Sequence, residues 1–311
     1  MEKNSKIFVA GHRGLVGSAI VRTLQNEGCN NLILRTRAEL DLTNQQAVAE
    51  FFAKEKPEYV FLSAAKVGGI MANKTHPAEF IYENLTIQTN IIHSSHKNNV
   101  KKLLFLGSSC IYPRNCHQPM KEEYLLSGEL EPTNKAYSLA KIAGIAMCQS
   151  YNEQYGTNFI SLMPSNVYGP HDNFDLESAH VVPSVINKFH NAKINNDQQV
   201  VMWGTGSAMR EFLHVDDLAD ACLFLMQNYN DSSIINVGSG EDVTIKELTE
   251  IVSDVVGYEG KIIWDTTKPD GMPRKLVDVS KLHSLGWKHD THLHEGIAST
   301  YEWFKENYKH D

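Results

Sequence analysis

The sequence GSSCIYP at residues 107–113 places two hydroxyl groups and a thiol directly after the apolar run LLFL. A strand that ends in this way presents side chains at the carboxyl edge of a parallel sheet, where α/β enzymes bind ligands. Ser108 could hydrogen-bond a substrate carbonyl oxygen. Cys110 is either a second reactive group or a packing residue, because free cysteines are often small buried hydrophobes. The stretch indicates a candidate site and leaves the role of the thiol open.

A second reactive pair, Tyr137 and Lys141, is spaced four residues apart in the segment YSLAK. If this segment is helical, both side chains lie on one face. A nearby ammonium favours the phenolate and is expected to lower the tyrosine pKa from about 10, which makes the phenol a usable acid or base. The pattern YxxxK is common by chance. Its weight comes from its place in the chain, after a glycine-rich turn and after the serine-bearing strand.

The glycine-rich turn is GHRGLVG, which follows the strand-like run KIFVA and opens a helical segment. Glycines at such a turn let backbone amides approach a pyrophosphate, and the helix N-terminus adds a favourable positive potential. The spacing GxxGxxG differs from the simplest fingerprint, GxGxxG. We expect the whole turn to bind a dinucleotide, with a tight turn that binds nothing as the alternative. Its members are Gly11, His12, Arg13, Gly14, Leu15, Val16 and Gly17.

The end of the second expected strand, NLILRTRAELDL, carries basic side chains. NAD-binding folds tend to place an acidic residue there for the ribose hydroxyls, whereas arginine suits the 2′-phosphate of NADP. Arg35 and Arg37 lie at this position, and Arg13 lies in the glycine turn. The sequence therefore predicts NADP(H). The alternative is that these arginines are only solvated surface charges.

Up to about residue 163 short β-rich runs alternate with helical stretches, which predicts an α/β fold with a Rossmann-type doubly wound parallel sheet. We expect an NADP-binding domain at residues 1–165. Residues 166–311 should form mainly a smaller substrate-binding lobe, with segments around 210–240 returning to the first domain. The expected elements of this half are a helix at 181–193, a strand at 200–203, helices that begin at Val215 and Thr244, a strand IINVG and a final helix at 294–306.

Composition excludes several classes of protein. The net charge of −8 argues against nonspecific binding to nucleic acid, which depends on neutralising phosphates. No apolar run approaches the roughly 20 residues of a membrane helix, and no export signal is visible. The five cysteines, Cys29, Cys110, Cys116, Cys148 and Cys222, lack CxxC spacing, which argues against disulfides and a metal site. We therefore expect a cytoplasmic enzyme with no metal.

The order of these motifs resembles the extended form of the short-chain dehydrogenase/reductase superfamily. GHRGLVGSAI, LFLGSSCIYP, EPTNKAYSLAKIAGI, PSNVYGPHDNF, WGTGSAMREFLHVDD and KPDGMPRKLVDVSKL further resemble the family of epimerase/reductases that form GDP-L-fucose. The resemblance implies NADPH-dependent conversion of GDP-4-keto-6-deoxy-D-mannose by epimerisation at C3 and C5 and reduction of the C4 ketone. It also implies a homodimer formed through the helices near residues 80–97 and 134–152.

The resemblance assigns roles to individual residues. Ser108, Tyr137 and Lys141 correspond to the reducing group, and Cys110 and His180 to the epimerising pair. The glycine turn, Arg35, Arg37, Lys141, Pro164, Ser165, Asn166, Val167 and His180 correspond to cofactor-binding positions. Lys188, Trp203, Arg210, Asp270 and Lys275 correspond to positions around the nucleotide sugar. At Lys188 we expect arginine in the family, which puts a bidentate contact there in doubt.

Each assignment has a structural alternative. Arg210 and Lys275 could be solvated charges, Trp203 could be a core residue, and Cys116 is a rival thiol that we expect to be ordinary. The competing enzyme is another nucleotide-sugar 4-epimerase or dehydratase, which would recycle bound NAD. A noncatalytic NADP-sensing protein would not need the complete serine, tyrosine and lysine set.

Overall fold

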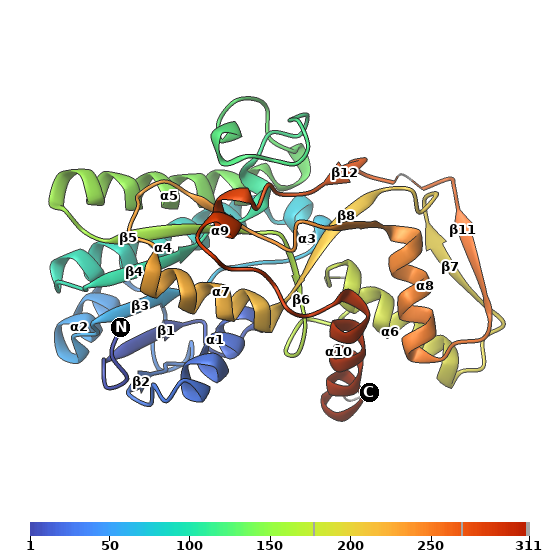
Figure 1. The fold of residues 1–311 in the computed structure, drawn as a ribbon, viewed down its shortest axis with the longest axis horizontal. Helices are drawn as coiled ribbons and strands as arrows, with labels where there is room; N and C mark the ends of the chain where they lie inside the picture. The colour runs from blue at the N-terminus through green and yellow to red at the C-terminus, as the bar shows by residue number, and fades with distance from the viewer. Residues whose placement is uncertain (177, 269, 309–311) are drawn as a thin grey trace.

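The computed structural model describes residues 1–176, 178–268 and 270–308. Its larger part is built on a six-stranded parallel sheet (Figure 1). In spatial order the strands are β2 (Leu32–Ile33), β1 (Ile7–Ala10), β3 (Tyr59–Leu62), β4 (Lys102–Leu106), β5 (Phe159–Pro164) and β9 (Ile235–Val237). The chain starts in the middle of the sheet, runs to one edge and then crosses to the other side. The switch point between β1 and β3 is the position where doubly wound sheets bind ligands.

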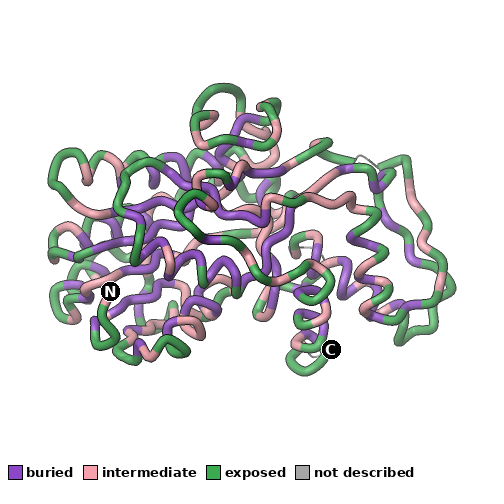
Figure 2. The backbone as a smooth tube through the Cα atoms, viewed as in Figure 1, coloured by how far each residue is buried: buried purple, intermediate pink, exposed green. Residues whose placement is uncertain are grey.

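Helices cover both faces of this sheet, as the sequence predicts. Along β1, Ile7 and Val9 point into one apolar core and Phe8 and Ala10 into the other, because successive side chains of a strand alternate. The first core is closed by α1 (Leu15–Asn26) and α7 (Val215–Asn228). The second is closed by α2 (Gln45–Glu55), α4 (Pro77–Lys97) and α5 (Lys135–Tyr155). Burial on both faces explains the nearly continuous apolar runs of the strands (Figure 2). The predicted fold class is confirmed.

A smaller lobe forms around a third apolar core that includes Phe189, Leu248 and Phe304. It comprises α6 (Val181–Ile194), α8 (Ile245–Val256), α10 (Leu293–Asn307) and the parallel pair β7 (Gln199–Trp203) and β11 (Lys261–Asp265). The predicted helices and the strand of this half are confirmed, with small differences at their ends. Thr244 caps α8 through a capping box with Glu247, which fixes where that helix begins.

Between the two parts lies a small mixed sheet around β8 (Met209–His214). The parallel partners of β8 are β6 (Asn166–Tyr168) and β12 (Arg274–Lys275), and its antiparallel partner is β10 (Asp242–Thr244). The remaining short elements are α3 (Ile70–Thr75), α9 (Ser280–Ser284), η1 (Ser109–Ile111), η2 (Glu122–Tyr124) and η3 (Pro132–Asn134). Within the described residues, no helix is long and apolar enough to cross a membrane.

Candidate active site

The turn after β4 brings Ser108 and Cys110 together. Ser108 has an extended backbone and precedes η1, and its Oγ accepts a hydrogen bond of 3.2 Å from the backbone N–H of Cys110. Helix α5 packs over this turn, where the buried Ser138 Oγ donates to the carbonyl oxygen of Cys110 at 2.8 Å. The first turn of α5 and the end of β4 therefore hold the thiol-bearing segment from two sides.

Lys141 fixes the same helix to the end of β4. Its side chain is 3% exposed, and its Nζ donates to the carbonyl oxygen of Leu106 at 2.8 Å. The ammonium lies 4.9 Å from the ring centroid of Phe105 and 5.7 Å from that of Tyr137. Lys141 and Tyr137 share one face of α5, as their spacing predicts. The lysine lies beneath the phenol, close to the ring centroid.

The prediction that a lysine ammonium lowers the tyrosine pKa is wrong for the free protein. Burial and the neighbouring Cys110 charge raise the pKa of Tyr137 above 10.0, although a hydrogen bond with Ser108 opposes the shift. Burial also lowers the pKa of Lys141 from 10.5 to about 7. Desolvation disfavours the charged form of each group. Tyr137 therefore holds its proton near neutral pH, which suits a general acid.

Cys110 has a different electrostatic environment. Burial by itself would raise the pKa of the thiol, but the Lys275 ammonium and hydrogen bonds with Ser108, Lys275 and Asn134 bring it below the ordinary value. Lys275 Nζ lies 3.4 Å from Cys110 Sγ. Thiolates are the reactive form of cysteine, and a neighbouring cation stabilises them. Cys110 is thus suited to accept a proton.

His180 lies at the N-cap of α6. Surrounding protein and the Lys275 ammonium lower the pKa of this imidazole below 6.5. The charge of Lys275 thus lowers the pKa of both His180 and Cys110. The free protein therefore favours a neutral imidazole near pH 7.

The nucleotide end has the shape that a dinucleotide requires. Gly11 has a φ of +86°, and a Cβ on Gly17 would lie 2.1 Å from the carbonyl oxygen of Gly11. The N-terminus of α1 has neither a side-chain cap nor an acidic residue in its first turn, so its first N–H groups face the turn without a competing anion. Backbone amides and the helix dipole together suit a pyrophosphate. The residues present therefore fit the cofactor that the sequence predicts.

The three predicted arginines lie at this end with different partners. Arg35 pairs with Glu55 at 3.0 Å, and Arg37 lies 3.8 Å from Glu83 with its side chain 76% exposed. Arg13 is exposed in the glycine turn. Glu39, which sequence reasoning missed, follows β2 as an acidic residue, but Thr36 hydrogen-bonds its carboxylate, and these bonds with the charges of Arg35 and Arg13 lower its pKa.

The predicted positions after β5 lie beside the main sheet. Pro164 ends β5, and the N–H of Ser165 donates to the carbonyl oxygen of Val237 at 2.9 Å. The Ser165 hydroxyl is buried and has no partner among the described residues. Asn166 and Val167 form part of β6, and the Asn166 amide donates to the carbonyl oxygen of Glu211 at 2.7 Å.

The structure brings two of the predicted substrate-binding residues together. Arg210 and Lys275 are paired in the register of β8 and β12. Burial lowers the pKa of Arg210, whose guanidinium donates to the carbonyl oxygen of Met209 at 2.7 Å. Lys188 donates from its half-buried Nζ to the carbonyl oxygen of Val201.

The other two lie elsewhere in the lobe. Trp203 is 67% exposed with the Lys268 ammonium 5.7 Å from its ring centroid, so core packing does not explain it. Asp270 is engaged by a neighbouring turn, where its carboxylate accepts from the Thr205 N–H at 2.6 Å and from the Thr205 hydroxyl at 2.9 Å. These contacts of Asp270 are thus internal to the lobe.

Sequence reasoning also missed Asn134 and Glu211. Asn134 hydrogen-bonds toward the Cys110 thiol from η3. Glu211 is 1% exposed in β8, and its carboxylate accepts from the N–H groups of Gly240 at 2.8 Å and Val277 at 3.0 Å. An acidic residue within the apolar run of REFLHV was the available signal for Glu211.

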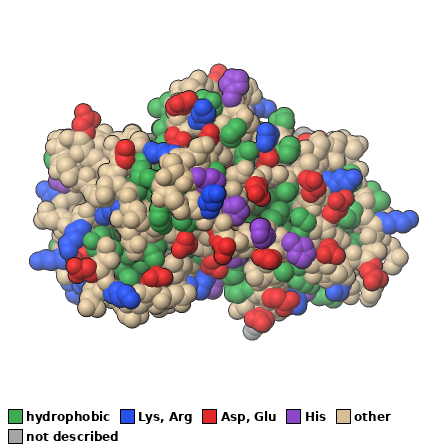
Figure 3. Space-filling model, in the orientation of Figure 1, with side chains coloured by type: hydrophobic (Ala, Val, Ile, Leu, Met, Phe, Trp, Pro, Cys, Tyr) green, Lys and Arg blue, Asp and Glu red, His purple; other side chains and the backbone are tan. Residues whose placement is uncertain are grey.

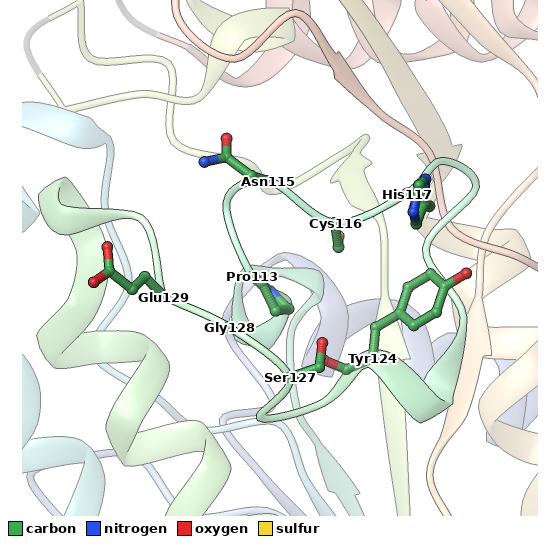
Figure 4. Close-up of a pocket in the computed structure, with 8 residues that line it drawn as sticks. All are labelled: Pro113, Asn115, Cys116, His117, Tyr124, Ser127, Gly128 and Glu129. Atoms are coloured by element: carbon green, nitrogen blue, oxygen red, sulfur yellow. The ribbon is translucent and has the colours of Figure 1, made fainter.

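A cavity of about 590 Å³ lies in the loop after η1 (Figure 4). It is lined by Pro113, Asn115, Cys116, His117, Tyr124, Ser127, Gly128 and Glu129. None of the predicted catalytic, cofactor-binding or substrate-binding residues lines it. Burial raises the pKa of the Cys116 thiol, which agrees with the expectation that this cysteine is ordinary.

Comparison with known proteins places these motifs in one group. Residues 7–238 match the NAD dependent epimerase/dehydratase family. A putative GDP-L-fucose synthase 2 from Arabidopsis thaliana is 62% identical over 307 residues, covering 99% of this chain and 94% of that protein. The GDP-L-fucose synthase of Escherichia coli strain K12 is 55% identical over 311 residues, covering 97% of each chain.

Among solved structures, the GDP-mannoheptose C4 reductase from Campylobacter jejuni with NADP bound is similar to this chain. It has a TM-score of 0.92 at 49% identity and covers 98% of this chain and 99% of that chain. The similarity therefore extends over both parts of the fold.

Proposed function

The chain belongs to the NAD dependent epimerase/dehydratase family and within it to the GDP-L-fucose synthases, and from this premise we propose how its residues act. It is an NADPH-dependent enzyme that converts GDP-4-keto-6-deoxy-D-mannose to GDP-L-fucose. Epimerisation at C3 and C5 precedes reduction at C4. The observation that carries the proposal is the convergence of a cation-paired thiol, Cys110, with Ser108 and the protonated Tyr137 at the end of β4.

NADP(H) is the cofactor, and the glycine turn and the N-terminus of α1 would hold its pyrophosphate. Arg13, Arg35 and Arg37 would bind the 2′-phosphate through charge-assisted hydrogen bonds. Pro164, Ser165, Asn166, Val167 and His180, from β5, β6 and the N-cap of α6, would complete its binding site together with Lys141. When bound, NADPH supplies the hydride that reduces C4.

In the reduction, Ser108 and Tyr137 donate hydrogen bonds to the C4 oxygen, where negative charge develops. Tyr137 then gives its proton to this oxygen as the carbonyl becomes an alkoxide. The raised pKa of Tyr137 keeps that proton available at neutral pH. Lys141, buried beneath the ring, stabilises the phenolate that remains.

In the epimerisation, the C4 ketone makes the protons on C3 and C5 acidic. Cys110 Sγ accepts one of them, and the electron pair of the broken C–H bond moves into the enolate, whose oxygen Ser108 and Tyr137 stabilise. His180 returns a proton to the same carbon on the opposite face, which inverts it. Each inversion therefore starts with Cys110 as thiolate and His180 as imidazolium, and ends with Cys110 as thiol and His180 as neutral imidazole.

The GDP-sugar would lie along β8, β12 and α6. Arg210 would bind the diphosphate bidentately and Lys188 as a point charge, while Trp203 offers an exposed ring for the nucleotide. Asp270 would contact the GDP-sugar and would also hold the turn at 204–206 through its hydrogen bond with Thr205. Lys275 would lie between the sugar and the two basic side chains of Arg210 and Lys188.

One assay tests the proposal. Purified protein is mixed with NADPH and GDP-4-keto-6-deoxy-D-mannose, NADPH absorbance is followed and the product sugar is identified by NMR. We expect one NADPH consumed for each GDP-L-fucose formed. A 4-epimerase that recycles bound NAD would change the sugar with no net loss of NADPH absorbance, and that result would overturn the proposal.

We also propose a homodimer formed through α4 and α5. These two helices pack against each other and carry exposed large side chains, Tyr82 on α4 and Leu139 and Tyr155 on α5. Exposed apolar surface of this kind marks interaction sites. Light scattering coupled to size-exclusion chromatography should give twice the chain mass of 35.0 kDa. A monomer at micromolar concentration would contradict this assignment.

We propose a cytoplasmic location. All five cysteines are free thiols, which fits a reducing compartment. Charged side chains of both signs are interspersed over the face shown in Figure 3, which gives no reason to expect a charged partner there. Fractionation of cells that express the tagged protein tests the location, and recovery in a secreted fraction would contradict it.

A further inference from the structure

Lys275, which the family resemblance assigns to the nucleotide sugar, contacts the proposed base. Its Nζ lies 3.4 Å from Cys110 Sγ, within hydrogen-bonding distance for sulfur. The two residues are 165 positions apart in the chain, so tertiary structure alone creates the contact. Both side chains are partly shielded from solvent, where a charge pair is stronger than in water.

The strand that carries Lys275 is held firmly against the Cys110 segment. The Met120 N–H donates to the carbonyl oxygen of Leu276 at 2.7 Å, and the Leu276 N–H donates to Gln118 Oε1 at 2.8 Å. Met120 and Val277 form an isolated parallel bridge. The loop that follows Cys110 therefore pairs with the residues that follow Lys275, which ties the two segments together.

The buried carboxylate of Glu211 anchors the strand from its other side. Glu211 accepts from the Val277 N–H at 3.0 Å and from the Gly240 N–H at 2.8 Å. Burial raises its pKa to about 7. A carboxylate 1% exposed is costly to bury without hydrogen-bond partners, so these bonds strongly specify the position of the strand.

The other groups around the thiol do not replace Lys275 as a cation. Tyr137 on α5 is neutral near pH 7, and Ser108 before η1 and Asn134 on η3 are uncharged hydrogen-bonding groups. His180 at the N-cap of α6 and Cys116 in the following loop both feel the charge of Lys275. Among the described residues, Lys275 is thus the charged group that acts on Cys110.

We propose that Lys275 is a positioning residue for epimerisation, whose ammonium pairs with the Cys110 thiolate and holds it ready to accept the sugar proton. This inference rests on the proposed role of Cys110 as the base. In the free enzyme the S–H bond breaks, its electron pair stays on sulfur and the proton leaves to solvent, from which His180 takes up the proton that it later returns to the sugar carbon. When Cys110 later takes a proton from C3 or C5, the ammonium stays protonated and the site loses one thiolate–ammonium pair.

The test measures the thiol directly, without substrate or NADPH. In a Cys116→Ser background, the rate of alkylation of Cys110 by iodoacetamide is measured against pH, with the modified residue identified by mass spectrometry. Lys275→Met removes the charge at similar length, Lys275→Arg keeps it, and Lys121→Met removes an exposed positive charge from the neighbouring loop as the matched control.

We expect Lys275→Met to move the midpoint of the pH profile upward and to slow alkylation at pH 7 at least about tenfold, because an opposite charge within 4–6 Å favours thiolate strongly. Lys275→Arg should restore most of the rate, and Lys121→Met should leave it unchanged. Unchanged alkylation in folded Lys275→Met would overturn the proposal. If that variant does not fold, a parent protein whose Cys110 titrates as an ordinary thiol overturns it equally.

A second measurement separates this role from diphosphate binding. At saturating GDP-4-keto-6-deoxy-D-mannose, solvent deuterium exchange into C3 and C5 should fall at least about tenfold in Lys275→Met. A lysine that only binds diphosphate would raise KM and leave the saturated exchange rate intact, which contradicts the proposal. A protein that makes no GDP-L-fucose at all but shows the expected alkylation shift would contradict the proposed function and leave the thiolate pair standing.

Discussion

Tyr137 and Lys141 lie on one helix that packs against η1 and β4, whereas Cys110, His180 and Lys275 come from three segments distant in the chain. Lys141 is locked by a 2.8 Å bond to the end of β4, in the core of the larger part. Lys275 is held on a two-residue strand at the junction with the smaller lobe. The proposed reducing group is thus local and rigid, and the proposed epimerising group is assembled over long distances.

This difference predicts that the two reactions can be separated by mutation. A change at Tyr137 or Lys141 should leave the thiol and its cation in place, because they are held by η1, β8 and the loop at Met120. A change in the epimerising group should leave Tyr137 and Lys141 on α5 undisturbed. The following experiments test this separation, from the largest expected effect to the smallest.

Tyr137→Phe should impair reduction far more than epimerisation, in which Ser108 remains as a second donor to the C4 oxygen. It deletes the proton donor and keeps the ring over Lys141, so NADPH oxidation should fall by about 10²–10⁴-fold, the usual contribution of general acid catalysis. Solvent deuterium exchange at C3 and C5 should continue, because Ser108 still hydrogen-bonds the C4 oxygen. Undiminished NADPH oxidation with the GDP-sugar would show that another group is the acid.

Cys110→Ser should have the opposite effect. A hydroxyl is a much weaker base than a thiolate, so deuterium exchange should fall by at least about 100-fold. The variant retains Ser108, Tyr137 and Lys141 and should still reduce the ketone slowly, which would give a 6-deoxy sugar with the original configuration at C3 and C5. Normal exchange together with normal GDP-L-fucose formation would return Cys110 to a packing role.

Arg13→Ala tests whether the cofactor-binding end acts independently of the reducing group and the epimerising group. Loss of a hydrogen bond to a charged phosphate costs about 1.5–3 kcal/mol, so NADPH affinity should fall by at least about tenfold while NADH affinity stays the same. Lys54→Ala removes another exposed positive charge from the same part and serves as the control. Equal losses for NADPH and NADH would mean that Arg13 does not read the 2′-phosphate.

Ser138→Ala should give the smallest effect. That effect should fall on epimerisation more than on reduction. The variant removes the 2.8 Å bond to the Cys110 carbonyl oxygen, which is worth about 1 kcal/mol, and we expect exchange at C3 and C5 to slow by a few fold. Reduction should change less, because Lys141 still binds Leu106. Ser150→Ala, an exposed serine on the same helix, is the matched control. A larger loss in reduction than in exchange would reverse the interpretation.

The alternation of strands and helices was predictable because it follows from local patterns. Apolar runs such as LLFL, the glycine turn and the helical spacing of Tyr137 and Lys141 need no knowledge of distant residues. The strand 235–237 was expected to return to the main sheet, where it pairs with β5. The capping box at Thr244 marks the start of α8 in the sequence itself.

The pKa values of the site residues could not be predicted from local sequence patterns, because desolvation depends on all the elements packed around a group. The spacing of Tyr137 and Lys141 suggested a lowered tyrosine pKa, yet burial on α5 raises it and lowers that of Lys141. Asp270, expected at the sugar, hydrogen-bonds the turn at Thr205. Such outcomes depend on which neighbours exclude water and which donors lie closest.

By itself, then, the sequence determined the order of the elements, the turn for the cofactor and the residue types available for acid and base chemistry. Only the tertiary structure decided that Lys275 meets Cys110, because β8, the loop at Met120 and the buried Glu211 carboxylate together bring β12 to the end of β4. A contact between residues so distant in the chain cannot be predicted from local periodicity, because it depends on the pairing of β12 with β8.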